Sequence, residues 1–158
     1  MDWIPLLSTA VGAVIGVAST LIADWMRVNR SQKDGYQTLK RQLYGDYLAA
    51  LSQTRHSLRT AAQSSSEPVE VRARMALDAF KDAKAYEARY QVALVASDRV
   101  TEASTSAFNA LRNLRDLVES GGGTHSDPDY RAVQNQWADR FAELRRSMRS
   151  DLDRPVRQ

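Results

Sequence analysis

The sequence predicts an all-α protein in which an N-terminal transmembrane helix precedes an antiparallel four-helix bundle. The first observation is the stretch 3–23, which contains 21 consecutive residues without a charged side chain. As a helix it would be roughly 30 Å long, which is the thickness of a bilayer's hydrocarbon core. The second observation is that the rest of the chain is rich in helix-forming residues, while the whole sequence has only 7 glycines and 4 prolines. The residues after the span are enough for one compact domain.

The predicted transmembrane helix covers residues 3–26. Trp3 and Trp25 bracket it, at the positions where indole rings favour the membrane interface. A cleaved signal peptide would need a basic N-terminal region and an apolar core of about 7–15 residues. Here only Met1 and Asp2 precede a longer core. The sequence therefore favours a retained anchor in the plasma membrane.

Basic residues predict the orientation of this anchor. Arg27, Arg30 and Lys33 follow the span directly, and no basic side chain precedes it. By the positive-inside rule, the N-terminus should face out and the C-terminal domain should be cytoplasmic. We expect these three residues, together with Trp3 and Trp25, to contact lipid headgroups.

A stripe of small residues lies within the span: Ser8, Gly12, Gly16 and Thr20 recur every fourth position and share one helix face. Gly12 and Gly16 form a G-x-x-x-G pattern, which allows two helix backbones to approach closely. One interpretation is a self-associating anchor and a homo-oligomer. The other is that small residues are common in apolar spans and have no role here.

After a basic juxtamembrane linker at 27–35, we expect a cytoplasmic bundle at 36–152. Its first helix should cover 36–62, and the loop 63–68 should end it. The next 52 residues, 69–120, contain neither glycine nor proline. Because one helix of that length would be about 75 Å long, Ser97-Asp98 is taken as an internal cap that separates helices at 68–95 and 98–119. The alternative is one long central helix in a three-helix arrangement.

Periodic apolar positions define the expected core faces. In the first helix these are Leu39, Leu43, Tyr47, Leu51 and Leu58; in the second, Val71, Met75, Ala79, Tyr86, Tyr90 and Ala93; in the third, Val100, Ala107, Leu111, Leu114 and Val118.

The last helix has the clearest signals. The glycines at 121–123 should end the preceding helix, and Asp127 should cap the next one, with Pro128 in its first turn. The apolar stripe of this helix is Tyr130, Val133, Trp137, Phe141, Leu144, Met148 and Leu152. Residues 153–158 should form a frayed tail.

No pattern in the sequence indicates catalysis. Cysteine is absent, so thiolate chemistry and cysteine metal sites are excluded. The two histidines, His56 and His125, lack the Glu-x-x-His spacing of bundle metal sites, because Gln53 and Gly122 stand three residues before them. Nucleotide-binding and hydrolase motifs are also missing. We therefore expect no enzyme, no cofactor and no metal.

The charge pattern bears on partners. After the span, 22 basic and 17 acidic residues leave a modest positive excess, which suits membrane lipid but is too small to predict nucleic-acid binding. An arginine-rich end is interpreted as the solvated side of the last helix: Arg140, Arg145, Arg146, Arg149, Arg154 and Arg157.

The sequence resembles uncharacterised actinobacterial single-span membrane proteins with a helical cytoplasmic domain. The resemblance rests on the excess of arginine over lysine, on YGDYLAAL at 44–51 and on LVASDRV at 94–100. It implies no activity and no functional residue.

The predicted function is a membrane-anchored protein-interaction or scaffold module that binds another protein through its bundle. The alternative is a membrane-active oligomer, such as a small pore or a holin-like effector, assembled through the transmembrane helix.

Overall fold

The structure, a computed structural model, describes residues 35–121 and 123–153. These residues are 84% helical and contain no strand, so the all-α prediction is confirmed for them. Within these ranges, no helix is both long enough and apolar enough to cross a membrane. The predicted span at 3–26 lies outside the described residues. The chain divides into two compact units, Met1–Thr38 and Leu39–Gln158; of the first, residues 35–38 are described and are helical.

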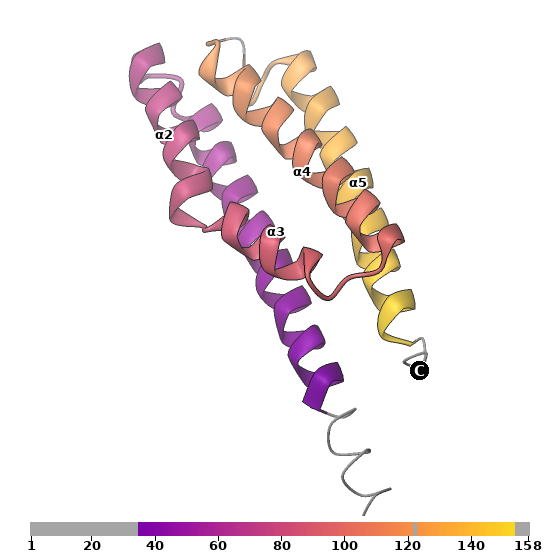
Figure 1. Ribbon diagram of the computed structural model, residues 1–158. Helices are drawn as coiled ribbons and strands as arrows, with labels where there is room; N and C mark the ends of the chain where they lie inside the picture. Colours follow the sequence, from indigo (N-terminus) through magenta and orange to yellow (C-terminus); the bar gives the residue numbers. More distant parts are fainter. Residues whose placement is uncertain (1–34, 122, 154–158) are drawn as a thin grey trace, which may run out of the picture. The chain divides into compact units, whose positions relative to one another are not determined.

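The second unit is a helical bundle (Figure 1). Residues 39–63 form its first helical segment, which we call the 39–63 helix. It is followed by α2 (Val69–Asp82), α3 (Ala85–Ala93), α4 (Asp98–Glu119) and α5 (Pro128–Leu152). The α4 and α5 helices pack along each other, and α2 packs on α4. The bundle thus has four long segments, of which the second is divided into α2 and α3.

Contacts between distant residues show that the 39–63 helix and α5 run antiparallel. Lys40 meets Asp151 near one end of the pair formed by the 39–63 helix and α5. Near the other end, the backbone N–H of His125 donates to the carbonyl of Ala62 at 3.2 Å. As residue numbers rise in one helix they fall in the other, as an up-down-up-down bundle requires.

The core contains most of the apolar positions that the sequence predicted. Four of the five named in the first helix, all five in the third and all seven in the fourth are buried or half-buried, whereas Leu39 is 50% exposed. The fully buried side chains of largest volume include Tyr47, Tyr130, Phe108, Leu51, Leu58, Leu111, Leu114 and Leu144.

The predicted ends of α4 and the predicted start of α5 are confirmed. The Asp127 carboxylate accepts a hydrogen bond from the backbone N–H of Asp129 at 2.9 Å, and Pro128 opens α5. Ser97 is the N-cap of α4 in an extended conformation. Gly121 ends α4 with φ 81°, a left-handed conformation that glycine adopts without steric cost.

The prediction of one helix over 68–95 is wrong. The chain forms α2 and α3 with a break at Ala83-Lys84, where Lys84 has φ 50° and ψ 35° in the left-handed region. Neither residue is a helix breaker, so no local signal marked this position. Together with the break at 94–97, the segment 68–119 consists of three helices.

The break changes which side of α3 faces the core. In α2 the buried residues are Arg72, Ala76, Ala79 and Phe80. A continuous helix would bring Tyr86 and Tyr90 inward, as the sequence suggested, but the turn at Lys84 rotates α3 so that Ala85, Ala88 and Val92 are buried instead. Small alanine side chains let α3 lie close to its neighbours. Tyr86 and Tyr90 are 38% and 69% exposed, and Val71 and Ala93 are exposed as well. The assignment of these four residues to the core stripe is therefore wrong.

The substitution Lys84→Gly tests this break, because its expected effect on the free energy of unfolding has one sign if the break is present and the opposite sign if the helix is continuous. Glycine removes the cost of a left-handed non-glycine residue and should raise the free energy of unfolding by about 1 kcal/mol. Within a continuous helix, the same change should lower it by about 1 kcal/mol. Denaturant unfolding of the full chain in mild detergent, followed by circular dichroism, measures the difference. Lys81→Gly, at an exposed position inside α2, is the matched control and should destabilise.

Candidate functional site

Three aromatic rings hold α3 against α4. The ring of Phe108 on α4 lies edge-on to Phe80 of α2 at 5.6 Å and to Tyr86 of α3 at 5.0 Å. The Phe80 and Tyr86 centroids are 5.8 Å apart. Edge-to-face pairs at these distances contribute beyond the area they bury. The aromatic cluster therefore positions α3 despite its short length.

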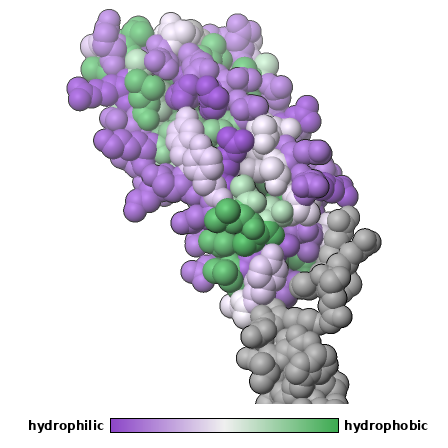
Figure 2. All heavy atoms as spheres, in the orientation of Figure 1, coloured by the Kyte–Doolittle hydropathy of each residue, from purple (hydrophilic) through white to green (hydrophobic). Residues whose placement is uncertain are grey.

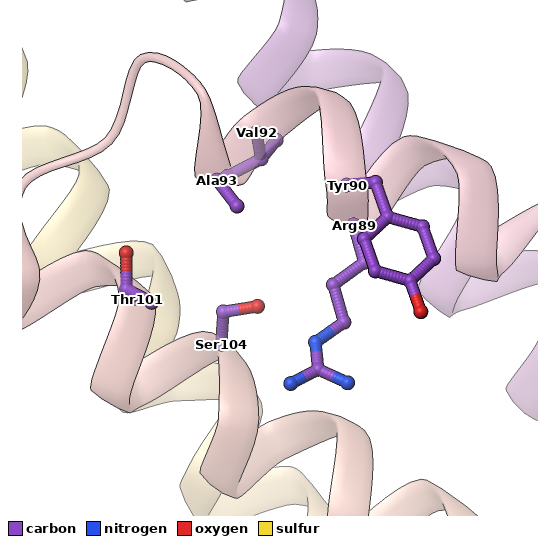
Figure 3. A pocket seen from close by; sticks show the side chains of 6 residues that line it. All are labelled: Arg89, Tyr90, Val92, Ala93, Thr101 and Ser104. Atoms are coloured by element: carbon purple, nitrogen blue, oxygen red, sulfur yellow. The ribbon is translucent and has the colours of Figure 1, made fainter.

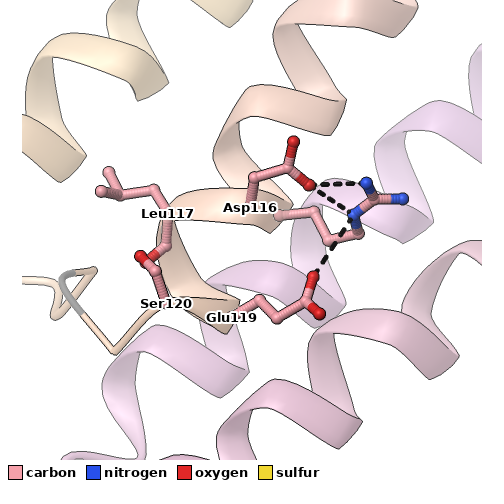
Figure 4. A network of polar contacts seen from close by, with 5 residues as sticks. Asp116, Leu117, Glu119 and Ser120 are labelled. Carbon is pink, nitrogen blue, oxygen red and sulfur yellow. Dashed lines mark hydrogen bonds and ion pairs between the residues drawn. The ribbon is translucent and has the colours of Figure 1, made fainter.

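Two arginines flank this aromatic cluster, and one of them has counter-ions. Arg115 lies over the Phe80 ring at 5.4 Å. Its Nε donates to Asp116 at 2.8 Å and lies 4.0 Å from Glu119; both of these acidic residues are labelled in Figure 4. The charge of Arg115 is thus balanced on α4 itself.

The second arginine, Arg89, lines a pocket of about 240 Å³ between α3 and α4. Tyr90, Val92 and Ala93 of α3, with Thr101 and Ser104 of α4, complete the lining. Figure 3 shows the Arg89 side chain extending from α3 toward α4, with the Tyr90 ring on one side and the Ser104 hydroxyl facing it on the other. The pocket combines one cationic group, two hydroxyl groups and small apolar side chains.

Two contacts fix the Arg89 side chain. Its guanidinium carbon lies 4.8 Å from the centroid of the Phe108 ring, within the range of a cation–π interaction. Its Nη2 donates to the Thr105 hydroxyl at 3.2 Å. Among the described residues no carboxylate lies within 4.0 Å of this guanidinium. Arg89 is therefore a positioned, half-buried cation with most of its five N–H donors available.

One residue of the pocket lining, Ser104, is held by the 39–63 helix. The hydroxyl groups of Tyr47 and Ser104 are 2.9 Å apart, and both residues are buried. Burial raises the pKa of the Tyr47 phenol, although the Ser104 hydrogen bond and the Arg89 charge lower it in part. The phenol is thus neutral at physiological pH and keeps Ser104 in place.

The outer rim of the pocket is exposed and apolar. Tyr90 is 69% exposed, and Leu94, one residue beyond α3, is 86% exposed. Figure 2 shows green apolar side chains gathered near the C-terminal end of α3, within a mostly purple polar face. We call Tyr90, Leu94 and the pocket between α3 and α4 the α3 surface.

A second polar group is buried where the 39–63 helix meets the end of α5. Lys40 Nζ lies 2.6 Å from Asp151 Oδ2, and their side chains are 10% and 7% exposed. The Tyr44 hydroxyl donates to the same oxygen at 2.5 Å. These contacts join the 39–63 helix to the C-terminal end of α5.

The ionisation of Asp151 follows from these neighbours. Burial alone would raise the pKa of the carboxyl group. Hydrogen bonds from Lys40, Tyr44 and Ser97, and the Lys40 charge, outweigh burial and bring the pKa below its ordinary value. Asp151 is therefore charged at physiological pH.

All site residues predicted for the membrane segment lie outside the described residues. These are the small-residue stripe of Ser8, Gly12, Gly16 and Thr20 and the interfacial set of Trp3, Trp25, Arg27, Arg30 and Lys33. Their roles stay predictions.

The structure places the two histidines and most of the C-terminal arginines. His56 is exposed, and His125 is half-buried in the α4–α5 loop, 6.0 Å from the Tyr130 ring. The arginines at 140, 145, 146 and 149 are exposed, as expected for the solvated side of the last helix. In the described ranges, no group of three or more His, Cys, Asp or Glu side chains could hold a metal ion.

Sequence reasoning missed Arg89 and the Lys40–Asp151 pair. Asp151 stands three residues after Met148, on the apolar stripe of α5, and Lys40 stands four before Tyr44. A charged residue in phase with a core face was therefore the available signal. For Arg89 no such signal existed, because the face of α3 depends on the break at Lys84.

Comparisons with protein-family models, with curated proteins and with solved structures found no match. The resemblance to actinobacterial membrane proteins stays a prediction.

Proposed function

We propose that this chain is a single-pass, membrane-anchored protein-interaction module, with its N-terminus outside and its helical bundle in the cytoplasm. The observation that carries the proposal is the α3 surface. There, Leu94 and Tyr90 expose apolar area beside a pocket, on a helix that the aromatic cluster holds in place. Apolar area exposed on a preorganised element lowers the cost of ordering on binding and favours association.

The membrane part of the proposal rests on the sequence. The uncharged stretch at 3–23 has the length of a bilayer core, and the basic residues after it predict a cytoplasmic bundle. An anchor that confines the module to a surface raises its effective concentration toward membrane-bound partners. Self-association through Gly12 and Gly16 is a compatible second use of the span.

Photo-crosslinking in living cells tests the interaction. Benzoylphenylalanine placed at Tyr90 of the full chain should give a discrete adduct with another protein. The same group at Gln136, an exposed position on α5, is the matched control and should give none. Leu94→Glu should reduce the Tyr90 adduct severalfold, because it puts a charge into the apolar rim. Equal adducts at positions 90 and 136 would show that α3 is not the binding surface.

A further inference from the structure

We propose that the pocket between α3 and α4 binds an acidic side chain of a partner peptide, with Arg89 as the residue that recognises its carboxylate. This inference rests on the proposed function and names the chemistry of the partner at the same surface. The observation behind it is that Phe108 and Thr105 position Arg89, while no carboxylate of the described residues lies within 4.0 Å of its guanidinium.

The charge of the site favours a group with a single negative charge. One guanidinium lines the pocket, and the other polar groups are the neutral hydroxyls of Thr101 and Ser104. A phosphate dianion is usually held by several cationic or N–H donors. A carboxylate needs one arginine, whose remaining donors form the fork that matches two carboxylate oxygens.

The volume of the pocket favours an amino-acid side chain over a cofactor as its ligand. Pockets for drug-sized ligands span about 300–1,000 Å³, whereas this one is about 240 Å³. The methylene groups of a glutamate can lie against Val92 and Ala93 while its carboxylate reaches Arg89.

The rim indicates what accompanies the acidic residue. Tyr90 and Leu94 lie one helical turn apart along the same side, and both are exposed. In a partner segment with an apolar residue near its glutamate or aspartate, the apolar residue would cover the rim and the acidic side chain would fill the pocket. An apolar cover also shields the Arg89–carboxylate pair from water, which strengthens it.

Matched peptide arrays test the proposal. The probes are 12-residue peptides of varied sequence that contain a Glu-Leu pair, each beside a twin in which Gln replaces Glu. The full chain in dodecylmaltoside should bind the best Glu peptides about 10- to 100-fold more tightly than their twins, as expected for a hydrogen-bonded charge pair. Arg89→Gln should abolish this preference, and Arg89→Lys should restore only part of it. Arg99→Gln, an exposed arginine on α4, should leave it unchanged.

Three outcomes would overturn the inference: no Glu preference, a preference that survives Arg89→Gln, or an equal loss with Arg99→Gln. The Tyr90 photo-adduct separates this failure from that of the proposed function. An adduct that forms equally well in the Arg89→Gln chain keeps the α3 surface as a binding site and rejects the acidic partner. Absence of the adduct in the wild-type chain rejects the proposed function itself.

Discussion

Replacing Asp151 by asparagine is expected to lower the free energy of unfolding by about 3 kcal/mol at pH 7. The substitution keeps the side-chain volume but leaves the buried Lys40 ammonium without its counter-ion. Removing one partner of a buried ion pair costs about 3–5 kcal/mol, and we expect the lower end because both side chains keep some exposure. Denaturant unfolding of the full chain in mild detergent measures this change.

Two controls separate the ion pair from a general effect. Asp139→Asn changes an exposed carboxylate on the same helix and should alter stability by less than about 0.5 kcal/mol. The double variant Lys40→Met with Asp151→Leu should recover part of the loss, because an apolar pair carries no desolvation cost, although the Tyr44 hydroxyl loses its bond to Asp151. A double variant as unstable as Asp151→Asn would contradict this explanation.

The contribution of Asp151 to the free energy of unfolding should also depend on pH. Since the pKa of Asp151 is lower in the folded protein than in the unfolded chain, its contribution to stability is complete above the unfolded pKa of about 4. It is lost as the pH falls through the lower folded pKa. The stability difference between the wild-type chain and Asp151→Asn should therefore be constant from pH 7 to about pH 5 and narrow below pH 4. A difference that widens in acid would show that the carboxyl group is not stabilised as a charged group.

The helical class and most of the bundle core followed from local patterns. The stripe of α5 and the cap at Asp127 lie within one element, so periodicity and capping rules were sufficient to predict them. The same holds for the stripe of α4 and the cap at Ser97.

What the sequence did not predict depends on contacts between elements. The turn at Lys84 forms between two good helix formers, and it is favoured because Ala85, Ala88 and Val92 then fit the core. That rotation places Arg89 over Phe108 and turns Tyr90 outward. The candidate site thus depends on the backbone conformation of Lys84, which no short-range rule predicts.

Disrupting the proposed membrane attachment should have the largest effect of all the changes considered. Two arginines near the middle of the span, Val11→Arg with Ile15→Arg, should each oppose insertion by about 3 kcal/mol. We expect this variant to leave the membrane fraction, whereas Val11→Leu with Ile15→Leu should stay in it.

The most direct measurement is carbonate extraction of membranes from cells that express the full, untagged chain. We expect the intact 158-residue polypeptide to stay in the membrane pellet, as an inserted helix requires. Recovery of the intact wild-type chain in the supernatant would contradict the proposed membrane attachment.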